Sequence, residues 1–440
     1  MSQNQFHHYI PRFILKNFSD NFQLRPSYIF SPNASGSFVQ EPFPTNGPVG
    51  GTNKRGNKKT RRKKSIGSNI RNGGKGDRED GQEIEKQASD KDFPINVYRT
   101  LEETITLNDI SRIYGIQNMY KDIAEEDSMK FEKLLGKLES TSAQFVHKIR
   151  SGEELTLTRT QLTEFKKFLA IMTYRVEHRR DQYYECKFDA RTLLSLRKHM
   201  LHNNIDRVQD VWFENLKWII KTSHEEFIEE YHKTHDQGNP YGISSSYKGP
   251  IHVLELLDYF HTIYSYVCVW QAEEGSEFIL SNNCFGTFEG DNGLIFQHFY
   301  VVSPKYAVVL TNRMYMWGNT MKDMTIRESW FGDELRLFPE TVYFKKSVKS
   351  PEDYDPKDVF KYQRLVASKE NVHFCNSILL DTKPKYITYK SNLCMYKTLR
   401  YYDKAKKHLS HSFPNGHSYL TLKREVFAKL KAEMNRTHRS

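Results

Sequence analysis

The chain has 440 residues, of which 38% are apolar, 13% aromatic and 27% charged. Its 28 Phe and 26 Tyr exclude disorder throughout, and the composition excludes a collagen-like or wholly coiled-coil protein. The longest nearly apolar stretch, 263–270, is far shorter than the ~20 residues of a membrane-spanning helix, and residues 1–13 lack the charged-then-apolar pattern of a signal peptide.

The net charge of +11 is distributed unevenly along the chain. Residues 54–64 carry eight basic and no acidic side chains, and residues 383–440 carry fourteen Lys or Arg against three acidic residues. Basic clusters favour phosphate-rich partners because binding releases counterions. We therefore expect nucleic acid or another polyanion as a partner through residues 54–64 and 383–440. The alternative is a solvated linker followed by a solvated helix face.

The cysteines indicate the compartment. There are five, an odd number, and no Cys-x-x-Cys pair occurs among positions 186, 268, 284, 375 and 394. This pattern is typical neither of a disulfide framework nor of a zinc site. We expect reduced thiols in an intracellular protein, cytoplasmic or nuclear.

The N-terminal third changes composition sharply. Residues 1–30 are rich in aromatic and aliphatic side chains, whereas residues 31–92 contain mostly Gly, Asn, Ser, Lys and Arg. Such a segment buries too little surface to offset its ordering entropy, so 31–92 is predicted to be a disordered basic insertion. Its KKTRRKK core fits a nuclear-import signal, a nucleic-acid-binding arm or a solubilising insertion.

Helical periodicity begins after the insertion. Apolar residues recur at spacings of three and four within 122–149, and Thr158 with Gln161 forms a capping-box pattern for the next helix, which runs on to Val176. Further helices are predicted within 187–200, 205–234 and 251–262, and later within 370–380 and 393–409.

Strand signals dominate from about residue 263. The runs 264–271 and 277–281 predict one hairpin, 294–302 and 306–311 predict another, and 342–344 and 387–389 read as short extended segments. The prediction is therefore an α+β fold with a helical first half (93–262) and a strand-rich second half (263–390). Residues 1–30 would belong to this main domain (93–390), and 391–440 would form a basic helical tail.

Several blocks carry a family resemblance. Residues 7–18, HHYIPRFILKNF, resemble the start of a widespread uncharacterised family, domain of unknown function 4238, whose members open with a His-Tyr-Val/Ile-Pro signature. Five later blocks resemble family segments in the same order: the helix with Glu132 and Glu139, the stretch 168–175, the strand ends 278–283 and 299–304, and the late helix containing Asn371. The resemblance covers residues 6–30 and 93–390, and implies one composite domain with no established activity.

The chain differs from the family pattern in two places. The insertion 31–92 has no counterpart, and a Ser-Asp-Asn-Pro strand end here reads Ser281-Asn282-Asn283-Cys284, which removes a carboxylate. The loss puts any metal-dependent chemistry in doubt. The extended block 281–290 is most similar to fungal members.

Five residues are candidates for a catalytic site: His8, Arg12, Glu139, Arg175 and Asn283. A histidine can transfer protons and an arginine can stabilise phosphate charge, which is what phosphodiester cleavage requires. Each candidate also has a structural interpretation, because the histidine can pack against the helices, Glu139 and Arg175 can form a buried ion pair, and the Asn can cap its own turn.

Cofactor and metal motifs give no signal. Three acid-x-x-His matches, 229–232, 258–261 and 370–373, are close to the roughly two expected by chance, so any metal or cofactor is left unknown. The sequence contains no Walker A loop, Gly-x-Gly-x-x-Gly or Gly-x-Ser-x-Gly motif. Two hypotheses remain: a module that binds nucleic acid or another polyanion, and a hydrolase acting on phosphodiesters.

Overall fold

A computed structural model describes residues 6–20, 28–32, 38–42, 93–120, 130–236, 239–243, 247–289, 295–312, 335, 340–343, 357–408 and 419–437. The chain divides into two compact units, Met1–Gln23 with Asp90–Ser440, and Leu24–Ser89. In the smaller unit, β2 (Tyr28–Pro32) and β3 (Phe38–Pro42) form an antiparallel hairpin, of which β3 and the end of β2 fall in the segment predicted to be disordered. The rest of 31–92, with the basic run 54–64, lies outside the described residues.

The largest sheet of the described residues has the strand order β12–β13–β14–β10–β17. Its strands are β10 (Tyr266–Ala272), β12 (Phe285–Glu289), β13 (Ile295–Ser303), β14 (Tyr306–Thr311) and β17 (Arg364–Ala367). Strand β10 runs antiparallel to β14 and parallel to β17. Nearly every residue of β10 is buried, as is typical of a central strand covered on both faces.

One predicted hairpin is confirmed and the other is wrong. Strands β13 and β14 pair across the turn at 303–306 as expected. Strand β10 does not pair with the 277–281 segment, because both of its edges are taken by β14 and β17. Instead β11 (Leu280–Ser281) pairs with β18 (Tyr386–Tyr389), more than a hundred residues later.

Smaller sheets use strands from both halves of the chain. Strand β11 begins the order β11–β18–β4–β5, in which β4 is Pro94–Arg99 and β5 is Thr104–Asp109. A three-stranded sheet joins β15 (Glu340–Tyr343), β16 (Val359–Tyr362) and β7 (Leu155–Thr158). Strand β1 (Phe6–His8) pairs with β6 (Gly115–Gln117), and β8 (His235–Asp236) pairs with β9 (Asn239–Ile243).

The mixed α and β content is therefore confirmed, but the division into a helical and a strand-rich half is wrong. Strands are interspersed along the whole chain. Strand β7, only four residues long, pairs with β16 some two hundred residues away, Leu157 opposite Phe360. A pattern of four residues is too short for periodicity to identify as a strand. Nor does local sequence show that its partner strand lies so far along the chain.

The helices follow the predicted order with shifted boundaries. In the N-terminal part they are a one-turn 3₁₀ helix (Ile110–Arg112), α1 (Arg12–Lys16), α2 (Lys130–Ser151), α3 (Arg159–Tyr174), α4 (Glu177–Tyr184), α5 (Ala190–Asn203), α6 (Val208–Lys221), α7 (His224–His232) and α8 (Val253–Tyr264). The C-terminal part adds α9 (Lys369–Asp381), α10 (Asn392–His408) and α11 (Leu420–Thr437).

Two helix predictions need correction. The segment 205–234 forms two helices, because Ser223 and Glu226 make a second capping box that starts α7 immediately after α6 ends. Helix α4 was not predicted, since its sequence EHRRDQYY is almost wholly polar and buries only Tyr183. Tertiary contacts rather than amphipathicity hold such a helix.

The capping box of α3 is confirmed. Thr158 Oγ1 accepts the Gln161 backbone N–H, and Gln161 Oε1 accepts the Thr158 backbone N–H. We expect Thr158→Ala to lower the free energy of unfolding by about 1 kcal/mol because it removes one of these caps. Urea unfolding measures the change, and Thr158→Ser is the matched control that keeps the hydroxyl. Equal losses in both variants would contradict this explanation.

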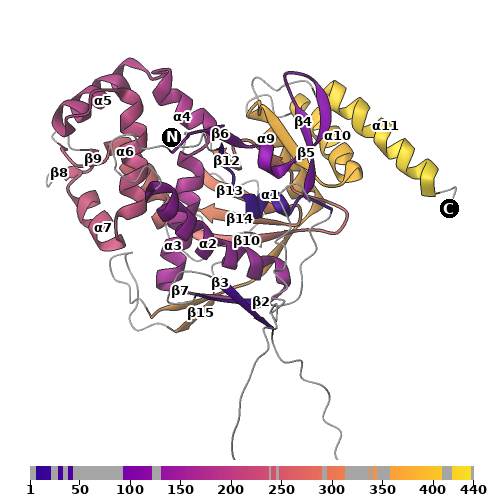
Figure 1. Cartoon of the computed structure of the whole chain (residues 1–440), viewed down its shortest axis with the longest axis horizontal. Coiled ribbons are helices and arrows are strands. Elements are labelled where there is room, and N and C mark those ends of the chain that lie inside the picture. Colours follow the sequence, from indigo (N-terminus) through magenta and orange to yellow (C-terminus); the bar gives the residue numbers. More distant parts are fainter. Residues whose placement is uncertain are drawn as a thin grey trace, which may run out of the picture. The chain divides into compact units, whose positions relative to one another are not determined.

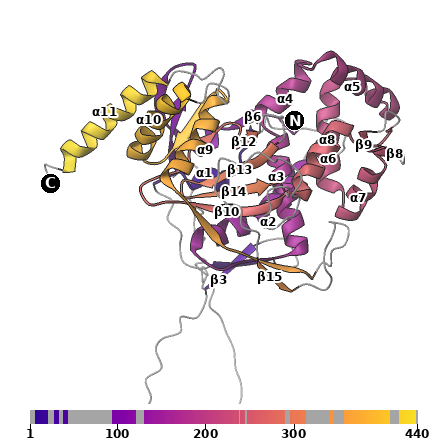
Figure 2. The same cartoon turned by 180° about the vertical axis from the view of Figure 1, so that it is seen from behind.

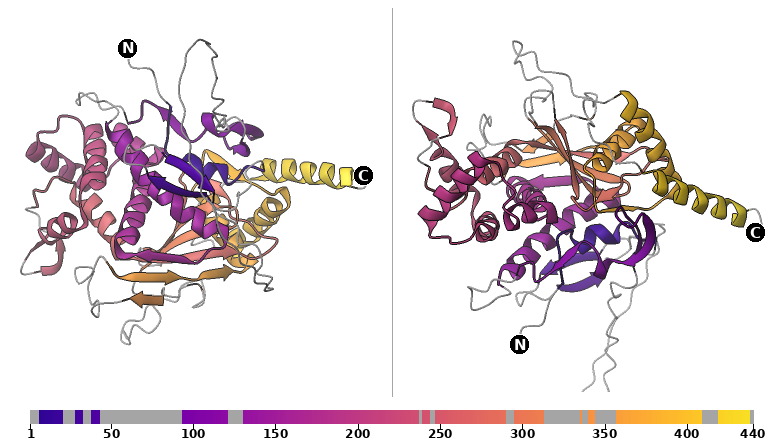
Figure 3. Two further views of the ribbon diagram at one scale, coloured as in Figure 1. Left: turned by 60° about the horizontal axis from the view of Figure 1, so that its bottom comes forward. Right: turned by 90° about the horizontal axis from the view of Figure 1, so that it is seen from above.

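Within the larger unit α4 to α11 lie in two groups with the strands between them, and α1, α2 and α3 lie beside the strands (Figure 1). Helices α4 to α8 lie beyond one end of the large sheet, and α9, α10 and α11 lie at the other, as the reverse view and the two further views also show (Figures 2 and 3). Helix α3 packs against α2, α6 and α8, and α9 packs against β12 and β17. One continuous hydrophobic core joins both groups.

Two further findings concern the cysteines and the helices. All five cysteines are free thiols, and only Cys186 is exposed. Within the part of the chain that the structure describes, every helix is too short or too polar to cross a membrane.

Candidate functional site

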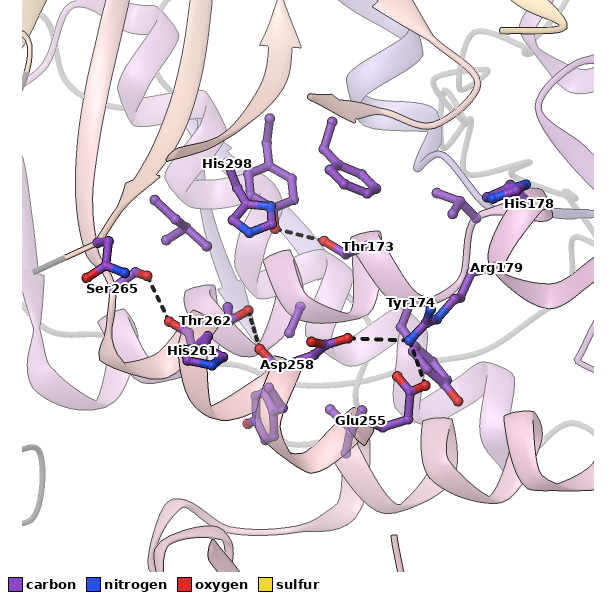
Figure 4. Close-up of a pocket in the computed structure, with 18 of the residues that line it drawn as sticks. Thr173, Tyr174, His178, Arg179, Glu255, Asp258, His261, Thr262, Ser265 and His298 are labelled. Carbon is purple, nitrogen blue, oxygen red and sulfur yellow. Dashed lines mark hydrogen bonds and ion pairs between the residues drawn. The ribbon is translucent and has the colours of Figure 1, made fainter. Parts of the chain in front are cut away.

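A pocket of about 470 Å³ opens where α3, α4 and α8 meet the large sheet (Figure 4). Its walls come from the end of α3, the start of α4, one face of α8 and the strands β12, β13 and β14. The lining combines aromatic rings with several titratable side chains, among them Tyr174, His178, Arg179, Glu255, Asp258, Tyr259, His261, Phe285, His298 and Tyr300. Concave, mostly apolar sites with a few convergent polar groups are the usual places for small ligands.

An arginine with two acidic partners forms the polar wall of the pocket. Arg179 Nη2 lies 2.6 Å from Glu255 Oε1 and 3.3 Å from Asp258 Oδ2 (Figure 4). The two carboxylates are three residues apart on α8, which places them on one helix face. Tyr183 Oη also donates to Glu255 Oε1 at 2.6 Å, so the buried Glu255 has both a cationic and a neutral donor.

The two carboxylates differ in their access to solvent. The Glu255 side chain is 3% exposed, whereas 67% of the Asp258 side chain is exposed. Asp258 therefore lies on the open side of the pocket. Partial desolvation there, with the negative charge of Glu255, raises the pKa of Asp258 to about 7, against the opposing effect of Arg179. Burial disfavours the charged Arg179, yet its acidic neighbours outweigh it and raise the arginine's pKa.

Two histidines lie at the other side of the pocket. His261 is on α8 one turn beyond Asp258, and His298 is on β13 (Figure 4). Burial, and then the nearby His261, lowers the pKa of His298 to about 4, and burial lowers the pKa of His261 as well. Both rings are therefore neutral at pH 7, when each can accept a proton or a hydrogen bond.

A hydroxyl pair joins α3 to the sheet where it lines the pocket. Thr173 Oγ1 donates to the Leu169 carbonyl oxygen at 3.2 Å, so the Tyr300 hydroxyl, 2.8 Å away, is placed to donate to Thr173. Burial raises the pKa of Tyr300, so the phenol stays neutral. This part of the wall thus offers fixed dipoles rather than charge.

The five residues predicted from the sequence lie elsewhere, and none of them lines this pocket. Glu139 and Arg175 are brought together: Arg175 Nη1 donates to Glu139 Oε1 at 2.5 Å, and the arginine is wholly buried. Burial disfavours the charged Arg175, but the carboxylate of Glu139 raises its pKa above the usual value. The pair is thus the buried ion pair that was one of the two interpretations.

The other three candidates lie apart from one another. His8 is half-buried on β1, with its ring against Phe6. Arg12 is exposed at the first position of α1. Asn283 accepts from Asn282 and donates to Thr382 Oγ1, at the end of α9.

Residues next to two of the candidates contact α2 and α3, the helices beside the ion pair. His7 Nε2 lies 3.8 Å from Glu132 Oε2, and Glu132 shares the inner face of α2 with Glu139. Cys284 packs against the end of α3, its Sγ 3.6 Å from the Met172 carbonyl oxygen. The nearby Arg175 opposes the effect of burial on the Cys284 pKa. Burial is the larger effect and raises it to about 12, so the thiol stays protonated.

Sequence reasoning missed the residues that do line the pocket. One signal was present: Asp258 and His261 form one of the three acid-x-x-His matches that chance explains, and they share a helix face. Arg179 and His298 have no local signal at all. Among the described residues, no group of three or more His, Cys, Asp or Glu side chains is arranged to hold a metal ion.

Comparison with known proteins identifies a family but no function. The family model described as a protein of unknown function, DUF4238, matches residues 7–392. No curated protein and no solved structure matches the chain. The match confirms the resemblance seen in the opening signature and the later blocks. It does not distinguish fungal from other members, so that part of the resemblance stays a prediction.

Proposed function

Because the chain belongs to the DUF4238 family, whose function is unknown, we propose from the pocket itself that it binds a small organic amine. The observation that carries the proposal is the Asp258 carboxylate, which faces the pocket and shares Arg179 with Glu255, while the buried Glu255 also accepts from Tyr183. With Asp258 ionised and His261 and His298 neutral, the Asp258 and Glu255 carboxylates outnumber Arg179 beside them. A cationic group fits this charge, and the aromatic walls fit an apolar body.

The same groups support proton transfer on the bound molecule. Asp258 has a pKa of about 7, and the ideal general acid or base titrates near the working pH. His261 and His298 supply neutral acceptors across the pocket. An acid–base reaction on the amine or on a neighbouring carbon is the chemistry that this arrangement favours.

Isothermal titration calorimetry with three probes of one shape tests the charge preference. We expect benzylamine to bind more tightly than benzyl alcohol, and benzoate most weakly. Asp258→Asn should weaken benzylamine binding about tenfold or more, since a charged hydrogen bond contributes roughly 1.5–3 kcal/mol, and should leave benzyl alcohol unchanged. Tighter binding of benzoate than of benzylamine would overturn the proposal.

The same titration has an expected pH dependence. Asp258 must lose its proton to attract the amine, so benzylamine affinity should rise with pH through about 7 and then level off. Glu255, Arg179 and His261 also face this carboxylate, and Asp258→Asn isolates its contribution. In Asp258→Asn the rise should disappear. A rise that persists in the variant would assign the titration to another group.

Polyanion binding is a second candidate, favoured by basic side chains on α10 and α11. Lys397, Arg400 and Lys404 are exposed and spaced three and four residues apart, so they share one face of α10. Arg424 and Lys431 are exposed seven residues apart on α11. They would form the nucleic-acid surface expected from 383–440, whereas the run 54–64 lies outside the described residues.

Fluorescence anisotropy with a labelled DNA duplex over a salt series tests this second candidate. Log affinity should fall with log salt by about 0.9 for each phosphate neutralised. Changing Lys397, Arg400 and Lys404 to Gln should reduce that slope by up to about three. The control removes the same charge from α5 by changing Arg191, Arg197 and Lys198 to Gln. Equal effects of the two triple variants would contradict a specific surface.

Hydrolysis of phosphodiesters by His8, Arg12, Glu139, Arg175 and Asn283 stays a prediction. A denaturing-gel assay tests it with labelled RNA and DNA in Mg²⁺ or Mn²⁺. We would compare the wild type with His8→Ala and, because His7 lies near Glu132, with His7→Ala. Cleavage lost only in one variant would assign the active histidine, and no cleavage by the wild type would exclude a nuclease acting on these substrates.

A further inference from the structure

A second group of polar side chains lies beneath the N-terminal strand, separate from the pocket. It gathers four parts of the chain: His7 on β1, Tyr120 after β6, Glu132 on α2 and Arg175 after α3. Within the described residues, two buried polar atoms of this group, His7 Nε2 and Glu132 Oε2, lie 3.8 Å apart without a hydrogen bond. The Tyr120 hydroxyl and the Arg175 guanidinium beside them lie close enough to interact with each other. Buried polar atoms are nearly always hydrogen-bonded, so the gap between His7 and Glu132 indicates an occupant.

The hydrogen bonds of His7 define which nitrogen carries its proton. The Tyr120 backbone N–H donates to His7 Nδ1 at 3.3 Å, so in the neutral ring the hydrogen is on Nε2. That N–H lies 3.8 Å from Glu132 Oε2, which is longer than a hydrogen bond. The tautomer also leaves no lone pair on Nε2 for a metal ion. The two atoms can instead both contact one oxygen placed between them.

The remaining members complete the inventory of donors and acceptors. Arg175 Nη1 bonds Glu139 and Nη2 contacts the Met172 sulfur, which leaves its Nε–H as a donor. The Tyr120 ring lies 5.3 Å from the His7 ring, and its hydroxyl can donate or accept. The group thus presents two N–H donors, one carboxylate acceptor and one phenol. A hydroxyl oxygen, which both accepts and donates, matches this set.

We propose that His7, Tyr120, Glu132 and Arg175 bind a hydroxyl oxygen, supplied either by a water molecule or by the hydroxyl group of a ligand. Glu132 accepts its hydrogen and is the base that can remove it. Burial and the negative charge of Glu139 raise the pKa of Glu132 to about 6, against Arg175 and Arg12. Glu132 is 32% exposed and Arg12 is exposed, so the group is within reach of solvent.

A crystal structure of the full chain at pH 7.5 tests the site directly. We expect an electron-density peak within about 3.2 Å of both His7 Nε2 and Glu132 Oε2. An isolated peak identifies water, whereas extended density, with a matching mass adduct in native mass spectrometry of the same preparation, identifies a ligand. A direct hydrogen bond between His7 and Glu132 or an empty gap would overturn the proposal.

Nuclear magnetic resonance of ¹⁵N-labelled histidine provides an independent readout that does not require crystals. The His7 signals should show a protonated Nε2 and an unprotonated Nδ1 at pH 7.5, and should shift as Glu132 titrates near pH 6. Glu132→Gln should abolish that shift and leave only the titration of His7 itself, whose pKa burial lowers, without changing the tautomer at pH 7.5. Glu164→Gln, a carboxylate of α3 paired with Lys167, is the control and should leave the shift intact. A protonated Nδ1 in the wild type would contradict the arrangement.

Discussion

Replacing Glu139 with leucine is expected to destabilise the fold by about 3–5 kcal/mol, because it leaves a buried arginine without its carboxylate. Arg175 is wholly buried at the end of α3, and its strongest hydrogen bond is the 2.5 Å contact with Glu139. Its contact with the Met172 sulfur is a weak hydrogen bond. Urea unfolding followed by circular dichroism measures the loss.

The double variant Glu139→Leu with Arg175→Leu separates the charge effect from packing. Once the cation is also removed, no unpaired charge is left by the first substitution, and replacing a whole buried pair by apolar residues is often close to neutral. We therefore expect the double variant to be more stable than Glu139→Leu alone. The single variant Arg175→Leu completes the comparison. If the loss of stability in the double variant equalled the sum of the losses in the two single variants, Arg175 would be solvated or otherwise paired, and the explanation would be wrong.

This ion pair shows what sequence can predict about a site. Glu139 and Arg175 were identified because each follows the family resemblance on successive helices, and helices with clear periodicity and a capping box are the elements whose positions sequence reveals best. The helices α2 and α3 are in place, so their inward residues meet.

The candidates His8 and Asn283 do not lie beside this ion pair. The sequence does not show which side of a short strand or turn faces the interior. His7 and His8 are adjacent on β1, and successive side chains of a strand point to opposite faces. His7 therefore lies near Glu132 while His8 packs against Phe6. In the turn after β11, Asn283 and Cys284 likewise point to different neighbours: Asn283 contacts Thr382, whereas Cys284 contacts Met172. One residue of register decides which of two neighbours faces the interior.

The pocket could not be predicted at all, since its residues come together only in the tertiary structure. Arg179 lies on a helix too polar to recognise, and His298 lies on a strand more than a hundred residues later. Only the Asp258–His261 spacing was visible, and chance explains it equally well. What distinguishes these residues is a shared cavity and an ion pair, and neither has a local sequence pattern.

The large sheet supports one wall of the pocket, and its interior strand β10 should be among the parts of the fold least tolerant of truncation. Trp270 is completely buried in β10, between β14 and β17, and its Nε1–H donates to the Leu335 carbonyl oxygen at 2.8 Å. We expect Trp270→Ala to cost about 3–5 kcal/mol, because it opens a cavity and removes the donor.

Trp270→Phe distinguishes the two contributions. Phenylalanine keeps most of the apolar volume but cannot donate to the Leu335 carbonyl, so its cost should be about 1–3 kcal/mol, the penalty for one unsatisfied buried group. The difference between the two variants in urea unfolding then measures the packing of β10 alone. Equal losses of stability would mean that the hydrogen bond, rather than the buried ring, stabilises this strand. Benzylamine binding to Trp270→Phe would then show whether the pocket wall depends on that hydrogen bond.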